Sequence, residues 1–330
     1  MDYSKVRGFN YQPSYGTTSF ENWLYFKPEF IELELRRGKH HFPKMNTIRL
    51  WLSWQAFVRN PEIFKNNFEE YLRIAKNLDL LVIPVLFNRW HDPQLDNGGI
   101  YIDHFMPGWS WASSKSGYNW ATNKDNLFQP YLDVIVGEHK KDERILLWDI
   151  CNEPFAYTKR VEDMKEVEVM EYKWLEETYK HCKSLDLIAP VGASLHFGHG
   201  RAGIERIEPI SDVLLIHPYY VAEHDDVEEK NKFEGILDEY VNFKEQVGKP
   251  MLATETCWGS LDDKWREENI RYTLTELKKR NIGWTVHALH HSGVADLHRP
   301  EFGPLDVPGN LSFIEKDGSL RPGHDVFNEF

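Results

Sequence analysis

The fold is decided by a short apolar run that carries a carboxylate and ends at a proline, Leu146-Leu147-Trp148-Asp149-Ile150-Cys151-Asn152-Glu153-Pro154. Successive side chains of a strand point to opposite faces, so the alternation predicts that Asp149, Cys151 and Glu153 share one face. Proline cannot continue the hydrogen-bonded ladder and ends the strand directly after the acid. Barrel enzymes build their sites at the carboxyl ends of parallel strands, which makes Glu153 a catalytic candidate. The alternative is a strand-terminal glutamate that only reaches water.

A second strand-like run also carries a glutamate near its end, Lys249-Pro250-Met251-Leu252-Ala253-Thr254-Glu255-Thr256-Cys257-Trp258. Alternation predicts that Met251, Ala253 and Glu255 share a face before the break at Gly259-Ser260. If both runs belong to one closed parallel barrel, their carboxyl ends meet at the same rim. The two acids can then divide the roles of proton donor and nucleophile, as cleavage of a glycosidic bond requires.

The composition is that of an ordinary globular protein with an acidic balance. Of 330 residues, 41% are hydrophobic and 28% are charged, and the formal net charge is −13. No stripe dense in Lys and Arg is present, so no nucleic-acid partner is predicted. The 12 tryptophans suit a carbohydrate partner, because indole faces stack on sugar rings, although most of them are expected in the core.

The cysteines and the N-terminal residues give information on the cellular compartment in which the protein resides. Cys151, Cys182 and Cys257 are too few for a disulfide framework and are interpreted as packing residues. No run is long enough to span a membrane, so no membrane partner is expected. The first residues lack the apolar core of a signal peptide, which predicts cytoplasmic residence for the sequence as it stands. Secretion or periplasmic residence remains open if a leader was removed.

Eight strand-like segments alternate with helical segments along the whole chain. The strands are expected at 6–12, 47–54, 80–87, 146–154, 187–192, 212–220, 249–258 and 281–289. Helical spacing occurs at 20–41 with a break at Pro28, and at 61–77, 127–140, 161–184, 232–247, 264–280 and 322–330, with a short crossover at 204–210. No low-complexity linker divides them. The pattern predicts an α/β protein, a (β/α)8 TIM barrel that forms a single domain over residues 1–330.

Two long irregular segments, 88–123 and 290–321, are expected at the active-site face of this barrel. Long loops in compact domains are usually functional. The first is rich in aromatic residues, Trp90 among them, and in glycines. This composition suggests a sugar-binding wall, and a hydrophobic plug is the alternative.

Polar residues stand at the ends or on the inward faces of two further strands. Arg49 should share a face with Trp51 and Ser53, which carries a cation toward the barrel interior. His217 and Tyr219 share a face near the end of the sixth strand. The alternatives are a surface arginine on an edge strand, a satisfied core histidine and a loop tyrosine.

In these residues the chain resembles the glycoside hydrolases of clan A, and most of all family 5, the cellulase and mannanase family. The matching pieces occur in the family's order over nearly the whole chain: Ile48-Arg49-Leu50-Trp51, Asn152-Glu153-Pro154, His217-Pro218-Tyr219 and Glu255. The resemblance implies that Glu153 is the general acid/base and that Glu255 is the nucleophile.

The resemblance also implies four supporting roles. Asn152 should bond the 2-hydroxyl of the substrate. Tyr219 and Arg49 should hold Glu255 ionised and oriented, while His217 should lie near the acid/base. This division agrees with the chemistry, because a cation and a phenol favour the charged form of a nucleophilic carboxylate.

Some positions depart from the family pattern. Asn88-Arg89-Trp90-His91-Asp92 resembles the loop of the β-mannanase branch. The strand before it ends without the histidine that the family often has, so that role is either lost or taken by His91. His287 stands where the family usually has the tryptophan that floors the catalytic subsite, and Trp284 could replace it only with a shifted register. Trp258, just beyond the second acid, is a further substrate-binding candidate.

Together these features predict a retaining β-glycoside hydrolase acting on β-mannan-type or β-glucan-type substrates by double displacement. Its two carboxyl groups should stand about 5 Å apart. The sugar, mannose, glucose or galactose, and the choice between endo and exo cleavage stay open. No cofactor or metal is predicted. The alternatives are a metal-dependent barrel hydrolase, suggested by His287, His290, His291 and His298, and a non-catalytic sugar-binding barrel.

Overall fold

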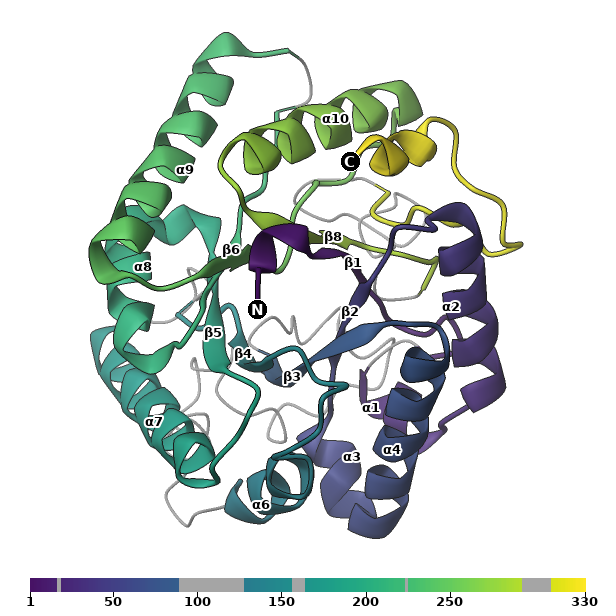
Figure 1. Ribbon diagram of the computed structural model, residues 1–330, viewed down its shortest axis with the longest axis vertical. Helices are drawn as coiled ribbons and strands as arrows, with labels where there is room; N and C mark the ends of the chain where they lie inside the picture. The colour runs from purple at the N-terminus through teal and green to yellow at the C-terminus, as the bar shows by residue number, and fades with distance from the viewer. Residues whose placement is uncertain (17–18, 89–127, 156–163, 223–224, 293–309) are drawn as a thin grey trace.

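Eight parallel strands close into one barrel, and helices surround it (Figure 1). The computed structural model describes residues 1–16, 19–88, 128–155, 164–222, 225–292 and 310–330. Each strand pairs in parallel with the next, and the last pairs with the first. The strands are β1 (Arg7–Asn10), β2 (Thr47–Trp51), β3 (Leu81–Asn88), β4 (Trp148–Asn152), β5 (Val191–His196), β6 (Leu214–His217), β7 (Met251–Ala253) and β8 (Gly283–His287). The predicted (β/α)8 barrel is therefore confirmed.

The helices begin at strong local signals. Prolines occupy the first positions of α2 and α4, where the missing N–H costs nothing, and aspartates cap α9 and α10. The α-helices are α1 (Ser19–Leu24), α2 (Pro28–His41), α3 (Trp54–Arg59), α4 (Pro61–Asn77), α6 (Gln129–Glu138), α7 (Met164–Ser184), α8 (Gly200–Ile207), α9 (Val227–Val247) and α10 (Asp263–Lys279). Short 3₁₀ helices are η1 (Tyr3–Lys5), η4 (Phe197–His199), η5 (Glu208–Ile210) and η7 (His324–Glu329).

The two faces of the strands bury different side chains. Outward-facing residues such as Ile48, Trp148 and Ile216 join one large apolar cluster with the helices. A smaller apolar cluster includes Val213, Leu215 and Leu252 together with Tyr3 and Val6, which flank or belong to η1. Figure 1 shows η1, in purple, lying across the centre of the ring of strands. The amino end of the barrel is thus plugged by apolar side chains, which leaves the polar inward residues for the other end.

One glycine lets η1 approach this closely. A Cβ at Gly283, the first residue of β8, would lie 2.0 Å from the carbonyl oxygen of Tyr3. No side chain fits at that distance, so only glycine allows β8 to start beneath η1.

The fifth strand, the crossover and the terminal helix are three of the predicted segments that differ from the observed ones. The fifth strand was expected at 187–192, but β5 begins after Pro190, because proline cannot donate to the ladder. The crossover expected at 204–210 is the helix α8 followed by η5. The terminal helix expected at 322–330 is a 3₁₀ helix that starts after Gly323, whose φ of +75° lies in the left-handed region. The loop expected at 88–123 lies outside the described residues except for Asn88, as does most of the segment 290–321.

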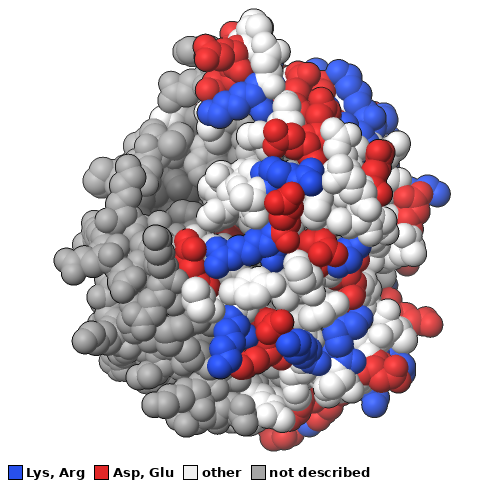
Figure 2. Space-filling view, turned by 90° about the vertical axis from the view of Figure 1, so that its left-hand side faces the viewer, with Lys and Arg blue, Asp and Glu red and all other residues white. Residues whose placement is uncertain are grey.

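The described part of the surface on the left-hand side of Figure 1 mixes charges of both signs, as Figure 2 shows. Charges also pair within single helices at i and i+4, for example Lys180 with Glu176 in α7 and Arg201 with Glu205 in α8. Exposed pairs of this kind contribute little to stability. The described part of this face is therefore an ordinary solvated surface. None of the described helices is long and apolar enough to cross a membrane.

Candidate active site

Glu153 lies directly after β4, and irregular backbone turns its side chain into the barrel mouth. Its φ of +48° is in the left-handed region, and the pairing of β4 with β5 shifts register between Asp149 and Asn152. Cys151 therefore packs in the outer apolar cluster, while Asn152 reaches an arginine inside the barrel. The predicted shared face of Asp149, Cys151 and Glu153 is wrong, because the irregularity breaks the alternation.

Glu255 also lies beyond its strand. β7 ends at Ala253, and both Met251 and Ala253 belong to the outer cluster, whereas Leu252 belongs to the inner one. The predicted face of Met251, Ala253 and Glu255 is therefore wrong as well. Glu255 reaches the barrel mouth because the regular strand has already ended, so period 2 no longer sets its direction.

The two acids meet at the carboxyl end of the barrel. One carboxylate oxygen of Glu153, one of Glu255 and a ring nitrogen of His217 all lie within 4.8 Å of one another. Both glutamates are buried, with exposed fractions of 4% and 5%. Two carboxylates this close in a dry site cannot both ionise without a large cost, so their surroundings must separate their pKa values.

Arg49, on β2, forms hydrogen bonds with the polar side chains that lie beneath the two acids. Its side chain is fully buried. Its Nη1 donates to Oε1 of Glu255 at 2.6 Å, and its Nε and Nη2 both donate to Oδ2 of Asp149, at 3.1 and 2.8 Å. Further hydrogen bonds run from Nη1 and Nη2 to side-chain oxygens of three other strands, those of Asn10, Asn152 and Ser194. One guanidinium thus orients Glu255 and couples five strands.

The second oxygen of Glu255 faces a phenol and two imidazoles. The Oη of Tyr219 donates to Oε2 at 2.8 Å, and the Nδ1 atoms of His217 and His287 each lie 3.6 Å from Oε2. Burial alone would raise the pKa of Glu255. The neighbouring imidazole of His217, the Arg49 guanidinium and the imidazole of His287 outweigh it and hold that pKa well below its ordinary value. Glu255 is therefore the ionised acid of the pair.

Glu153 has the opposite environment. Burial and the negative charge of Glu255 raise its pKa well above the ordinary value, and the opposing effect of Arg49 is smaller. Its Oε1 shares a 2.6 Å hydrogen bond with Nδ1 of His217, whose Nε2 lies 3.1 Å from Oγ1 of Thr254. Burial lowers the pKa of His217 well below its usual value. Glu153 is the protonated acid of the pair.

These shifts predict a bell-shaped pH dependence of kcat/KM. Activity should fall as the pH drops through the lowered pKa of Glu255, and again as the pH rises through the raised pKa of Glu153. The charge of Asp149 helps to raise the pKa of Glu153. In Asp149→Asn, the alkaline limb should therefore move to lower pH, which a pH–rate profile measures. Asp186→Asn, an exposed aspartate paired with Lys141, is the matched control, and an unmoved limb in Asp149→Asn would contradict the prediction.

Aromatic side chains stand beside the acids. The indole of Trp51 lies 4.9 Å from the Arg49 guanidinium carbon and 5.9 Å from the His287 ring. Trp258 packs edge-on against Tyr219, with ring centroids 5.3 Å apart. The predicted candidates Trp258 and His287 are thus in the site, and Trp51 joins them.

The residue at the end of β3 takes part in the site in an unexpected way. Nδ2 of Asn152 donates to Oδ1 of Asn88 at 3.1 Å. Asn88 thus helps to hold Asn152, at the position where a histidine was expected from the resemblance. The predicted candidates Trp90 and His91 lie outside the described residues.

Besides Trp51 and Asn88, four polar residues of the site were not among the sequence candidates: Asn10, Asp149, Ser194 and Thr254. Each lies in a strand or directly after one, which is the signal that could have identified them. Ser194 was out of reach because the fifth strand was placed too early in the sequence. Asp149 was placed on the same face as Glu153, but its contact with Arg49 depends on barrel closure.

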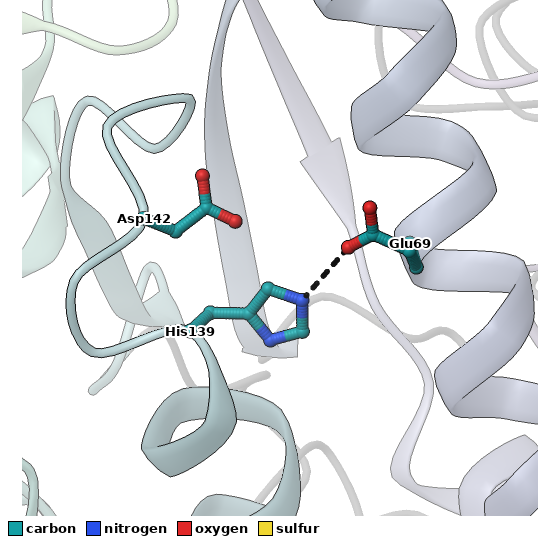
Figure 3. A group of neighbouring side chains, drawn as sticks. All are labelled: Glu69, His139 and Asp142. Atoms are coloured by element: carbon teal, nitrogen blue, oxygen red, sulfur yellow. Dashed lines mark ion pairs between the residues drawn. The ribbon is translucent and has the colours of Figure 1, made fainter.

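A second group of possible metal ligands lies near the opposite end of the barrel (Figure 3). Glu69 of α4 faces His139, with Nε2 and Oε2 3.6 Å apart, and Asp142 lies close by. The guanidinium of Arg144 donates to both oxygens of Glu69 and to both oxygens of Asp142. Because this arginine already supplies the positive charge, the group is interpreted as a salt-bridge network.

The predicted histidine cluster divides between two environments. His287 faces Glu255, whereas His290 is buried against Arg37 and Glu34, with Arg37 Nη1 3.2 Å from its Nε2. His298 lies outside the described residues. Within the part of the chain that the structure describes, these histidines do not form a common group of ligands.

Residues 24–183 match the family model for cellulase (glycosyl hydrolase family 5). The matched segment includes Arg49, Asn152 and Glu153, and it ends before Glu255. A search of curated protein sequences finds no significant match.

Several solved structures are similar over almost the whole chain. An exo-β-1,4-mannosidase from Opitutaceae bacterium strain TAV5 has 16% identity and a TM-score of 0.71, with 98% of this chain and 58% of that chain covered. A β-glucuronidase from Ruminococcus gnavus has 13% identity and a TM-score of 0.66, with coverages of 98% and 49%. A GH5_18 variant from Streptomyces cattleya in complex with Manβ1-4GlcNAc has 13% identity and a TM-score of 0.65, with coverages of 98% and 79%. The chain therefore spans only about half the length of the first two proteins, and at these identities the likeness concerns the fold.

Proposed function

We propose that this chain, a member of glycoside hydrolase clan A most like family 5, is a retaining β-glycoside hydrolase that works by double displacement. The observation that carries the proposal is the buried pair Glu153 and Glu255. Their oxygens lie within 4.8 Å of each other, with the pKa of one raised and that of the other lowered. Retaining enzymes need carboxyl groups about 5–5.5 Å apart, whereas inverting enzymes leave roughly 6.5–9.5 Å for a water molecule.

In the first step, Glu255 attacks the anomeric carbon while Glu153 gives its proton to the leaving oxygen. Arg49 and Tyr219 occupy the two oxygens of Glu255 and keep it ionised and aimed. Asn152 has its Oδ1 held by Arg49 and one Nδ2 hydrogen directed to Asn88, so a second Nδ2 hydrogen remains for the substrate's 2-hydroxyl. The aglycone leaves as an alcohol, and the sugar is bound covalently to Glu255.

The second step needs Glu153 as a base. A change in the charge of the site during the first step makes Glu153 ionise. Once Glu255 carries the sugar as an ester, its negative charge is gone. That charge is one of the causes that raise the pKa of Glu153, so the pKa of Glu153 falls in the intermediate. The ionised Glu153 can then take a proton from water, which attacks the anomeric carbon and releases the sugar.

The substrate class is proposed from the aromatic side chains of the described site together with the relatives. Trp51, Trp258 and Tyr219 suit a sugar ring. The relatives are described as a β-mannosidase, a β-glucuronidase and a complex with a β1-4-linked disaccharide, all of them concerned with β-linked sugars. We therefore propose β-linked oligosaccharides or polysaccharides of the mannan or glucan type as substrates.

The stereochemical outcome tests this proposal. A screen of nitrophenyl β-glucosides, β-mannosides and β-galactosides, beside glucan and mannan, would first identify an active substrate. NMR of the early products should then show the β-anomer forming first, with the α-anomer appearing only by mutarotation. An α-anomer as the first product would contradict double displacement.

A metal-dependent hydrolase is the second candidate, because Glu153, His217 and Glu255 offer three possible ligands within 4.8 Å. Their hydrogen bonds favour the glycosidase. Arg49 and Tyr219 already donate to the two oxygens of Glu255, and His217 bonds Glu153. A positive guanidinium directly on a would-be ligand opposes cation binding there.

A further inference from the structure

The turn that carries Glu153 has a strained backbone. Glu153 and Phe155 have φ values of +48° and +67°, and Pro154 lies between them. Residues with a Cβ rarely adopt such left-handed angles, and a bulky residue such as phenylalanine does so only where its surroundings hold it there. The direction of the Glu153 side chain therefore depends on the contacts that hold this turn.

Two hydrogen bonds hold the backbone of the turn. Pro154 has no N–H, so the donors of the turn are the N–H groups of Glu153 and Phe155. The N–H of Glu153 donates to the carbonyl oxygen of Ser194 on β5 at 3.0 Å. The N–H of Phe155 donates to Oε2 of Glu171, a side chain of α7, at 3.2 Å. Glu171 is 0% exposed, so this bond is shielded from competing water.

The ring of Phe155 is held as well. The guanidinium carbon of Arg206, on α8, lies 3.8 Å from the centroid of this ring, and the ring of Tyr172 is stacked with it at a centroid distance of 6.4 Å. Because the φ of Pro154 is fixed by its own ring, a shift of Phe155 is passed on to Glu153 with little adjustment between them. The hydrogen bond at Phe155 thus helps to set where the carboxyl group of Glu153 points.

We infer that Glu171 is a positioning residue for the acid/base Glu153. Its Oε2 holds the N–H of Phe155 in place and, through Pro154, directs the proton of Glu153 to the leaving oxygen of the substrate. This inference rests on the proposed function and goes beyond it, because Glu171 acts through the backbone of the turn. Proton transfer is sensitive to such positioning, since a displacement of about 1 Å can cost roughly 100-fold in rate.

The leaving group of the substrate distinguishes poor positioning of Glu153 from a general loss of structure. A 2,4-dinitrophenolate is stable as an anion and leaves without a proton from Glu153, whereas an unsubstituted phenolate needs that proton. A variant that positions Glu153 poorly should therefore be slow mainly on substrates with a basic leaving group. A partly unfolded variant should be equally slow on all of them. The suitable readout is kcat/KM, because it reports the first step, in which the leaving group departs.

The test measures kcat/KM for a series of aryl β-glycosides, from 2,4-dinitrophenyl to phenyl, on the sugar that the protein hydrolyses best. Glu171→Leu removes the acceptor, Glu171→Asp draws the carboxyl group back by one methylene, and Glu171→Gln keeps an acceptor oxygen at the original reach. Glu153→Ala, which lacks the acid, defines the steepest dependence on the pKa of the leaving group. Glu176→Leu is the matched control, a partly exposed glutamate of α7 that is paired with Lys180.

Glu171→Leu and Glu171→Asp should lose roughly 10- to 100-fold in kcat/KM on the phenyl glycoside and about 3-fold or less on the dinitrophenyl glycoside. Their plots of log kcat/KM against the pKa of the leaving group should be steeper than that of the unaltered chain and approach that of Glu153→Ala. Glu171→Gln should keep the slope of the unaltered chain, because its amide oxygen can still accept from Phe155. Glu176→Leu should leave both slope and rate unchanged.

Two results would overturn the inference while leaving the proposed function intact: a loss in Glu171→Leu and Glu171→Asp that is equal for all leaving groups, or no loss in either variant. If Glu171→Leu does not fold, Glu171→Asp decides alone, because it keeps the carboxyl group and loses only its reach. If Glu153→Ala shows no steeper dependence than the unaltered chain, or if the unaltered chain hydrolyses no β-glycoside, the proposed function itself fails, and the inference fails with it.

Discussion

Replacing Glu255 by alanine should lower kcat roughly 10⁴- to 10⁶-fold, as the loss of a covalent catalytic group does in other enzymes. Without the carboxylate no glycosyl ester can form, while Glu153 still donates its proton to the leaving oxygen. The small side chain leaves space next to the anomeric carbon. Azide should enter that space, restore part of the turnover and yield an α-glycosyl azide, because it attacks from the side that Glu255 occupied.

The control and the readout make this result specific. Glu205→Ala removes a carboxylate that is paired on the surface with Arg201 and should leave turnover unchanged. NMR identifies the anomeric configuration of the azide product. Turnover of Glu255→Ala close to that of the unaltered chain, or a β-glycosyl azide as product, would show that Glu255 is not the nucleophile.

Arg49→Met should destabilise the fold by roughly 3–5 kcal/mol, the cost of removing one partner from a buried charge pair. Asp149 and Glu255 would both lose their cation, and their side chains are 0% and 7% exposed. Three further side-chain oxygens, on Asn10, Asn152 and Ser194, would lose a donor. Urea unfolding measures the loss, and the acid limb of the pH–rate profile should move to higher pH because Arg49 lowers the pKa of Glu255.

Arg144→Met is the matched control for this prediction. Arg144 also bridges two carboxylates, but it lies near the other end of the barrel and its side chain is 20% exposed. Water can solvate Glu69 and Asp142 once the arginine is gone, so the loss of stability should be smaller and turnover should persist. Equal losses of stability in the two variants would show that the buried ion pairs of Arg49 contribute no more to stability than the more exposed ion pairs of Arg144.

Helices could be predicted from sequence more closely than strands, for a local reason. The expected helix at 61–77 and the observed α4 have the same bounds, because Pro61 starts it and the apolar stripe runs to its end. Strand bounds depend on pairing with neighbours. The apolar residues before Pro190 resembled a strand, but the ladder with β4 and β6 begins at Val191.

The candidate site shows the same difference between features set by local sequence and features set by contacts between distant segments. Glu153 and Glu255 could be identified because each follows an apolar strand at the rim where parallel strands end. The faces assigned to them were wrong, because each side chain leaves from irregular backbone beyond its strand. Asn88 and Ser194 were missed, because their roles consist only of contacts with Asn152 and Arg49 from other strands.

The sequence by itself determined the alternation of strands and helices, the closed barrel that follows from it, and the positions of the two acids along the chain. These features depend on hydrophobic spacing and on prolines, which act over a few residues. Only the tertiary structure decided which acid is ionised and which is protonated. That assignment comes from Arg49, Tyr219 and His217, which barrel closure brings from distant parts of the chain into one buried site, where the low dielectric makes each contact strong.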